Sequence, residues 1–83
     1  METPPTDGLT CEEMLEILQM LQDLLERAAQ GMKIAGRALL QVQLFPEAGS
    51  MHTLEYFSRS QVEILKMIRE SFTENYVKPS SLQ

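Results

Sequence analysis

The chain has 83 residues, a formal net charge of −5, one cysteine and one histidine. This length allows one small domain, whose core is marginal without cross-links or association. One cysteine cannot form a disulfide within the chain, and one cysteine with one histidine makes a structural zinc site implausible. The acidic balance argues against nucleic acids and anionic membranes as partners.

The sequence predicts a soluble intracellular protein, cytoplasmic or nuclear. Its first ten residues, METPPTDGLT, are acidic and contain prolines, whereas a secretory signal needs a basic stretch and then an apolar run. No segment approaches the roughly 20 apolar residues that cross a bilayer. We therefore expect no membrane insertion, and a lone thiol is typical of a reducing compartment.

A first helix is predicted from about residue 11 to 45. Thr10 is expected to be its N-cap, and Glu13, three residues later, completes a capping box. The helix should end near Phe45 because Pro46 disfavours helical geometry in the residue before it. The apolar or small residues that recur at heptad spacing on one face form three rows: Met14, Leu21, Ala28, Ala35 and Val42; Ile17, Leu24, Gly31, Ala38 and Phe45; and Leu18, Leu25, Met32 and Leu39.

A second helix is predicted from about residue 51 to 76, with Ser50 or Thr53 as its N-cap. The fold class is therefore all-α, a two-helix antiparallel hairpin over residues 10–77 between flexible tails at 1–9 and 78–83. The stripe that should face the first helix comprises Leu54, Phe57, Gln61, Ile64, Leu65, Ile68 and Phe72.

Small residues are concentrated in the segment ERAAQGMKIAGRALL, residues 26–40. We expect Gly31 to face Leu65 and Ala28 to face Ile68, because small residues opposite large ones allow two helices to approach closely. A hinge at the glycines is an alternative, and a membrane dimerisation face is disfavoured by the charges within the segment. The residues expected in close helix packing are Ala28, Gly31, Ala35, Ala38, Ile64, Leu65 and Ile68.

The first helix should be longer than the second by roughly two turns. Residues 11–19 would then have no cover from their own chain, although the segment is apolar. We expect an obligate assembly, either a dimer resembling a four-helix bundle or a complex with another helical protein. The alternative is a marginal monomer on which these are ordinary, scattered surface apolar residues. The expected association interface consists of Met14, Leu15, Ile17, Leu18, Met20 and Leu21.

No catalytic residue, cofactor, metal site or small-molecule substrate is predicted. Cys11 and His52 should lie near opposite ends of the first helix, and no phosphate-binding loop, H-E-x-x-H or EF-hand pattern occurs. The stretch that carries Arg27, Lys33 and Arg37 has two interpretations, a contact for an acidic partner or ordinary solvated helix charge.

These features favour a non-enzymatic protein–protein interaction module that assembles with itself or with other helical proteins. In length and pattern the chain is similar to the small helical-hairpin subunits of synaptonemal, kinetochore and vesicle-tethering assemblies. The likeness covers only length and pattern and assigns no family; we expect a structural or adaptor subunit, for example of a meiotic-chromosome, spindle or vesicle-tethering scaffold. The alternatives are a groove that binds an amphipathic helix of a partner and a small thiol-dependent enzyme that uses Cys11.

Overall fold

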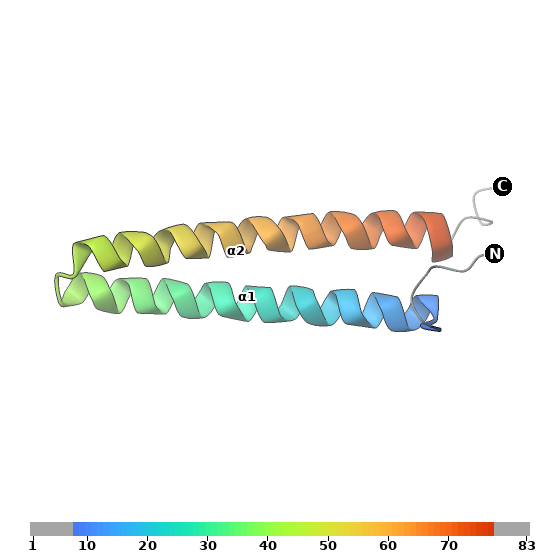
Figure 1. Ribbon diagram of the computed structural model, residues 1–83, viewed down its shortest axis with the longest axis horizontal. Coiled ribbons are helices and arrows are strands. Elements are labelled where there is room, and N and C mark those ends of the chain that lie inside the picture. The colour runs from blue at the N-terminus through green and yellow to red at the C-terminus, as the bar shows by residue number, and fades with distance from the viewer. Residues whose placement is uncertain (1–7, 78–83) are drawn as a thin grey trace.

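A computed structural model describes residues 8–77 of the chain. This part forms an antiparallel hairpin of two helices, α1 (Cys11–Gln41) and α2 (Phe45–Phe72), and a π-helical segment, η1 (Thr73–Val77), extends α2. The two helices lie side by side along their length (Figure 1). The all-α hairpin is confirmed, whereas the predicted tails lie outside the described residues except for Gly8 and Leu9.

The capping box at the start of α1 is confirmed. The Thr10 backbone N–H donates to Glu13 Oε1 at 2.9 Å, and the Glu13 backbone N–H donates to Thr10 Oγ1 at 3.0 Å. Two donors that the first helical turn leaves without partners are thereby satisfied. From this start α1 continues without interruption through Gly31 and Gly36, so the helix is not broken at these glycines.

The chain reverses over residues 42–44, earlier than predicted. The Leu44 N–H donates to the Leu39 carbonyl and the Gln43 N–H donates to the Leu40 carbonyl, both at 2.9 Å. These paired bonds form a Schellman motif, which ends a helix by placing one residue in the left-handed region. That residue is Gln43, whose φ is 65°. The predicted end of the first helix near Phe45 is therefore wrong.

The second helix begins at Phe45, not at Ser50 or Thr53 as predicted. Pro46 occupies its first turn, where its fixed φ suits a helix and its missing N–H has no helical partner to lose. Ser50 and Thr53 consequently lie inside α2, where the Thr53 hydroxyl donates to the Gly49 carbonyl at 3.1 Å. Pro46 was expected to end the first helix, but it lies in the first turn of the second.

Because α2 begins early and continues into η1, it covers α1 to its first turn. The Cys11 thiol donates to the Tyr76 carbonyl with a sulfur–oxygen distance of 3.7 Å. Further along, an Arg69 guanidinium N–H donates to the Gln19 side-chain oxygen. The expected overhang of residues 11–19 is therefore wrong.

The contact between the helices, here called the seam, follows a heptad pattern on each of them. Met51 lies opposite Gly36, 3.9 Å from the position a Cβ would take there, and the Ser58 hydroxyl donates to the Met32 sulfur at 3.5 Å. Every seam residue is buried or half-buried. On α1 they are Cys11, Leu15, Leu18, Gln22, Leu25, Ala29, Met32, Gly36 and Leu39, and on α2 they are Ala48, Met51, Glu55, Ser58, Val62, Leu65, Arg69 and Phe72.

The seam is a poor hydrophobic core. Among the described residues, the buried apolar side chains are Ala29, Ala48 and Val62, and no large side chain is fully buried. Gln22 and Ser58 share the buried interior with them. Because hydrophobic stabilisation scales with the apolar area removed from water, a single hairpin gains little from this contact.

The expected packing of the small residues is not found within the hairpin. Ala28, Gly31 and Ala38 are exposed, and so are Ile64 and Ile68, whereas Ala35 and Leu65 are half-buried. No atom lies within 4 Å of the position a Cβ would take on Gly31, so the contact expected with Leu65 is absent. The short turn explains this difference. It orients the two helices so that, on each, the row of residues one position after the predicted row forms the seam.

Replacement of Gln43 by glycine should stabilise the hairpin. Glycine adopts a positive φ without the steric cost that Gln43 bears, so we expect Gln43→Gly to raise the free energy of unfolding by about 1 kcal/mol. Gln41→Gly is the control, and it should lower that free energy by about 1 kcal/mol because Gln41 is helical. Urea unfolding at one fixed protein concentration measures both, and a loss of stability in both variants would contradict the assigned turn.

Replacement of Gln22 by leucine should also be stabilising. Gln22 is 7% exposed, its Nε2 lies 3.4 Å from Glu26 Oε2, and its Oε1 has no hydrogen-bond partner. Removing an unsatisfied buried acceptor should raise the free energy of unfolding by about 1–2 kcal/mol. The exposed Gln30→Leu serves as control and should change it by less than about 0.5 kcal/mol. A destabilised Gln22→Leu in urea unfolding would show that this amide has a structural role.

Candidate interaction surface

The most apolar surface of the hairpin lies beside the seam. In both helices its residues immediately precede seam residues: Leu24 precedes Leu25 on α1, and Ile64 precedes Leu65 on α2. One residue is a rotation of about 100° around an α-helix. Because the helices are antiparallel and face each other, the same rotation on each brings both rows to the same side of the hairpin. The two rows therefore form one continuous surface.

We call this surface the open face. Leu24 is 49% exposed, Phe57 56% and Ile64 55%, so large side chains on both helices remain accessible to water. Contiguous apolar surface of this kind marks interaction sites in soluble proteins. From α1 the open face comprises Met14, Ile17, Leu21, Leu24, Ala28, Gly31, Ala35 and Ala38, and from α2 it comprises Leu54, Phe57, Gln61, Ile64 and Ile68.

The opposite side of the hairpin is polar, because the residues that immediately follow seam residues carry its charges. Glu26 follows Leu25 on α1, and Glu63 follows Val62 on α2. Within α2, Arg59 pairs with Glu55 at 2.9 Å and Lys66 with Glu63 at 3.4 Å. The Glu63–Lys66 pair is exposed and contributes little to stability, whereas the Glu55 side chain is only 13% exposed and borders the seam.

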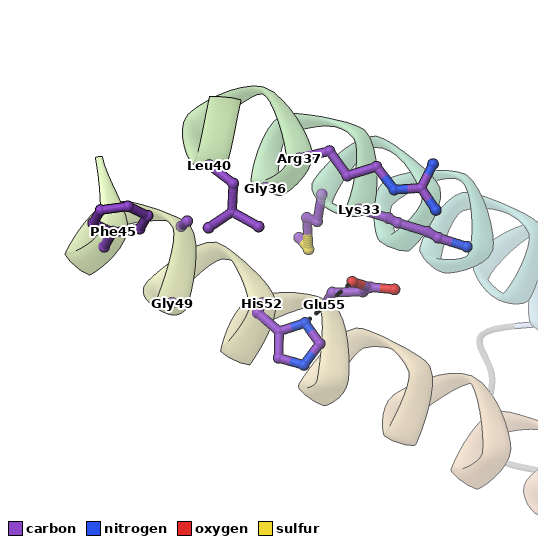
Figure 2. A pocket seen from close by; sticks show the side chains of 10 residues that line it. Lys33, Gly36, Arg37, Leu40, Phe45, Gly49, His52 and Glu55 are labelled. Carbon is purple, nitrogen blue, oxygen red and sulfur yellow. Dashed lines mark ion pairs between the residues drawn. The ribbon is translucent and has the colours of Figure 1, made fainter. Parts of the chain in front are cut away.

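A pocket of about 460 Å³ opens on the polar face beside the turn (Figure 2). Its floor is apolar and includes Met32, Leu40, Phe45 and Ala48. Its charged or titratable lining residues are Lys33 and Arg37 from α1, with His52 and Glu55 from α2. Such a pocket can receive an apolar side chain attached to an acidic segment.

Only two of the three basic residues predicted to contact an acidic partner line this pocket. Lys33 and Arg37 line it together, whereas Arg27 lies in a shallow depression with Asp23, Glu26 and Gln30. Glu55 already accepts a hydrogen bond from Arg59 at 2.9 Å, and His52 Nδ1 lies 3.8 Å from Glu55 Oε1. The pocket thus has two basic side chains on α1 for an anionic group.

Cys11 and His52, the two residues considered for catalysis, do not come together within residues 8–77. Cys11 contacts the end of the α2–η1 segment at Tyr76, whereas His52 lines the pocket beside the turn, so the two are at opposite ends of the hairpin. Across residues 8–77, no three His, Cys, Asp or Glu side chains are grouped to hold a metal ion. No helix in this range is long and apolar enough to span a membrane.

The predicted association interface is divided by the fold. Leu15 and Leu18 belong to the seam, whereas Met14 and Ile17 lie at the half-buried edge of the open face. Leu21 belongs to the open face and is 44% exposed, and Met20 is also exposed. The polar seam residues were missed because heptad analysis selected the most apolar rows, although the row one residue later has the same spacing.

No protein-family model, curated protein or solved structure matches this chain.

Proposed function

We propose that this chain is a non-enzymatic protein–protein interaction subunit whose open face pairs with a second copy to form a four-helix bundle. It acts as a structural or adaptor component in the cytoplasm or the nucleus. One observation carries the proposal: the hairpin buries almost no large apolar side chain, yet exposes a row of them on each helix.

The energetics favour association. Complete burial of a leucine, isoleucine or phenylalanine side chain contributes about 1.5–3 kcal/mol. On association, each open-face side chain would contribute the fraction of this free energy that corresponds to the area it still exposes in the single hairpin. Six large side chains of the open face are exposed: Leu21, Leu24, Leu54, Phe57, Ile64 and Ile68. For a domain of this size, whose own core leaves little net stability, that gain decides whether the chain folds.

The pocket favours a second candidate function. An acidic amphipathic helix from another protein could place an apolar side chain on the floor formed by Met32, Leu40 and Phe45. Its carboxylates would then pair with Lys33 and Arg37. The thiol-enzyme alternative has no such support, because His52 lies at the other end of the hairpin from Cys11.

Glutamate on the open face tests the proposed function. Leu24→Glu would bury a charge in the bundle, so we expect at least a tenfold weaker association. Gln30→Glu is the matched control, because Gln30 lies on the polar face, and its association should be unchanged. Size-exclusion chromatography with light scattering measures the mass at several loading concentrations. Equal masses for Leu24→Glu and the unmodified chain would refute the role of the open face.

If Leu24→Glu does not fold, Leu24→Ala provides the test. Alanine favours the helix, and the substitution removes apolar area without adding a charge. It should still weaken the dimer by about tenfold. For the second candidate, Arg37→Glu should leave the mass of the dimer unchanged while abolishing binding of an acidic helical peptide.

A further inference from the structure

We infer that the second copy packs on the open face with its turn at the opposite end of the bundle. In this arrangement α1 lies antiparallel to α1 of the second copy, and the two-fold axis crosses the open face at the level of residue 26, between Leu24 and Ala28. The inference rests on the proposed self-association and specifies its geometry.

Side-chain size along α1 supports this orientation. The open-face row of α1 is large in its first half and small in its second half. An antiparallel copy with the axis at the level of residue 26 places each large residue opposite a small one, which is how packed layers interdigitate. The opposed pairs, with the second residue from the second copy, are Met14 with Ala38, Ile17 with Ala35, Leu21 with Gly31, and Leu24 with Ala28.

This arrangement also gives a role to Gly31. Glycine costs a helix interior about 1 kcal/mol relative to alanine, and within the single hairpin no atom lies within 4 Å of its missing Cβ. The hairpin alone therefore gains nothing from a glycine at this position. In the antiparallel pair, Gly31 provides the space that Leu21 of the second copy fills.

A bundle with both turns at the same end opposes large and small residues less completely along α1. It would place α1 against α2 of the second copy, with Leu21 and Leu24 at the level of Ile68 and Ile64. Of the small residues of α1, Gly31 and Ala35 would then face the large residues Phe57 and Leu54. Both arrangements contain contacts between large residues, which in the antiparallel pair lie between the two α2 helices, so the pairing along α1 is what distinguishes them.

Charge provides an independent argument. The half of the hairpin next to the turn, residues 27–59, has four basic residues (Arg27, Lys33, Arg37 and Arg59) and two acidic ones (Glu47 and Glu55), a net charge of +2. The other half, residues 8–26 and 60–77, has eight acidic residues and two basic ones, a net charge of −6. Turns at opposite ends place each positive half beside a negative half, whereas turns at the same end place the two negative halves together.

The open face is close in size to the interface of a stable dimer. The open face runs from Met14 to Ala38 on α1, which is about 36 Å, and each helix is about 10 Å wide, so the face covers about 700 Å² per copy. A standard stable interface buries about 800 Å² per partner. The level of Glu26 on α2 is occupied by Gln61, the polar member of the open-face row, so two Gln61 amides near the axis can donate and accept hydrogen bonds between copies.

A residue swap tests which side chains oppose each other. Leu21→Ala and Gly31→Leu should each weaken the dimer by at least tenfold, the first by leaving a cavity and the second by opposing two leucines. Because positions 21 and 31 face each other in the antiparallel pair, the double variant L21A/G31L should recover most of the lost affinity. Losses that simply add in the double variant would overturn the proposed pairing.

A distance measurement tests the orientation directly. In a Cys11→Ser background, a spin label on Gln41→Cys lies near the turn, about 15 residues from the axis. Turns at opposite ends place the two labels of a dimer about 45 Å apart, and turns at the same end place them within about 25 Å. Pulsed electron paramagnetic resonance on the dimer should give the long distance.

The outcomes separate the two proposals. A dimer with the short distance would overturn the orientation and leave the proposed self-association standing. If the labelled chain and the unlabelled chain both remain monomeric at all accessible concentrations, both proposals are overturned. The Cys11→Ser chain without Gln41→Cys is the control and should have the same mass as the unmodified protein.

Discussion

The reversal at residues 42–44 determines how the two helices meet, and the rest of the structure follows from it. The Schellman motif makes the connection short, and α2 begins at Phe45. The short connection determines which side of α2 faces α1. It brings Glu55, Ser58 and Arg69 to the seam. It also turns the more apolar row of α2, with Phe57 and Ile64, to the same side as Leu21 and Leu24.

The main effect of the seam is to fix the alignment of the two helices, and its contribution to folding stability is small. Ser58 donates to Met32, Arg69 donates to Gln19, and Met51 fills the space beside Gly36. Polar groups at such positions are attested as a means of fixing the alignment of paired helices, at a cost in stability. In the proposed dimer, burial of the open face adds the apolar contact area that the seam lacks.

The sequence predicted what depends on local signals. The capping box at Thr10, the heptad periodicity of both helices and the antiparallel hairpin were all recovered, because each follows from residues close together in the chain. The start of α2 was missed because Pro46 is compatible with the end of one helix and with the first turn of another. The overhang was a consequence of that error.

The choice of seam could not be made from sequence. On each helix, two rows one residue apart have the same heptad spacing, and periodicity alone favours the more apolar row. The turn selected the other row, which contains Gln22 and Ser58. The sequence therefore identified the apolar residues of both helices, but it did not show which of them form the contact between the helices.

Sedimentation equilibrium combined with circular dichroism over a wide range of concentrations tests the central claim, that the open face requires a second copy. The account predicts a species of twice the 9.5-kDa chain mass, with mass and helix content falling together on dilution. A 9.5-kDa species that keeps its full helix content at every concentration would contradict it.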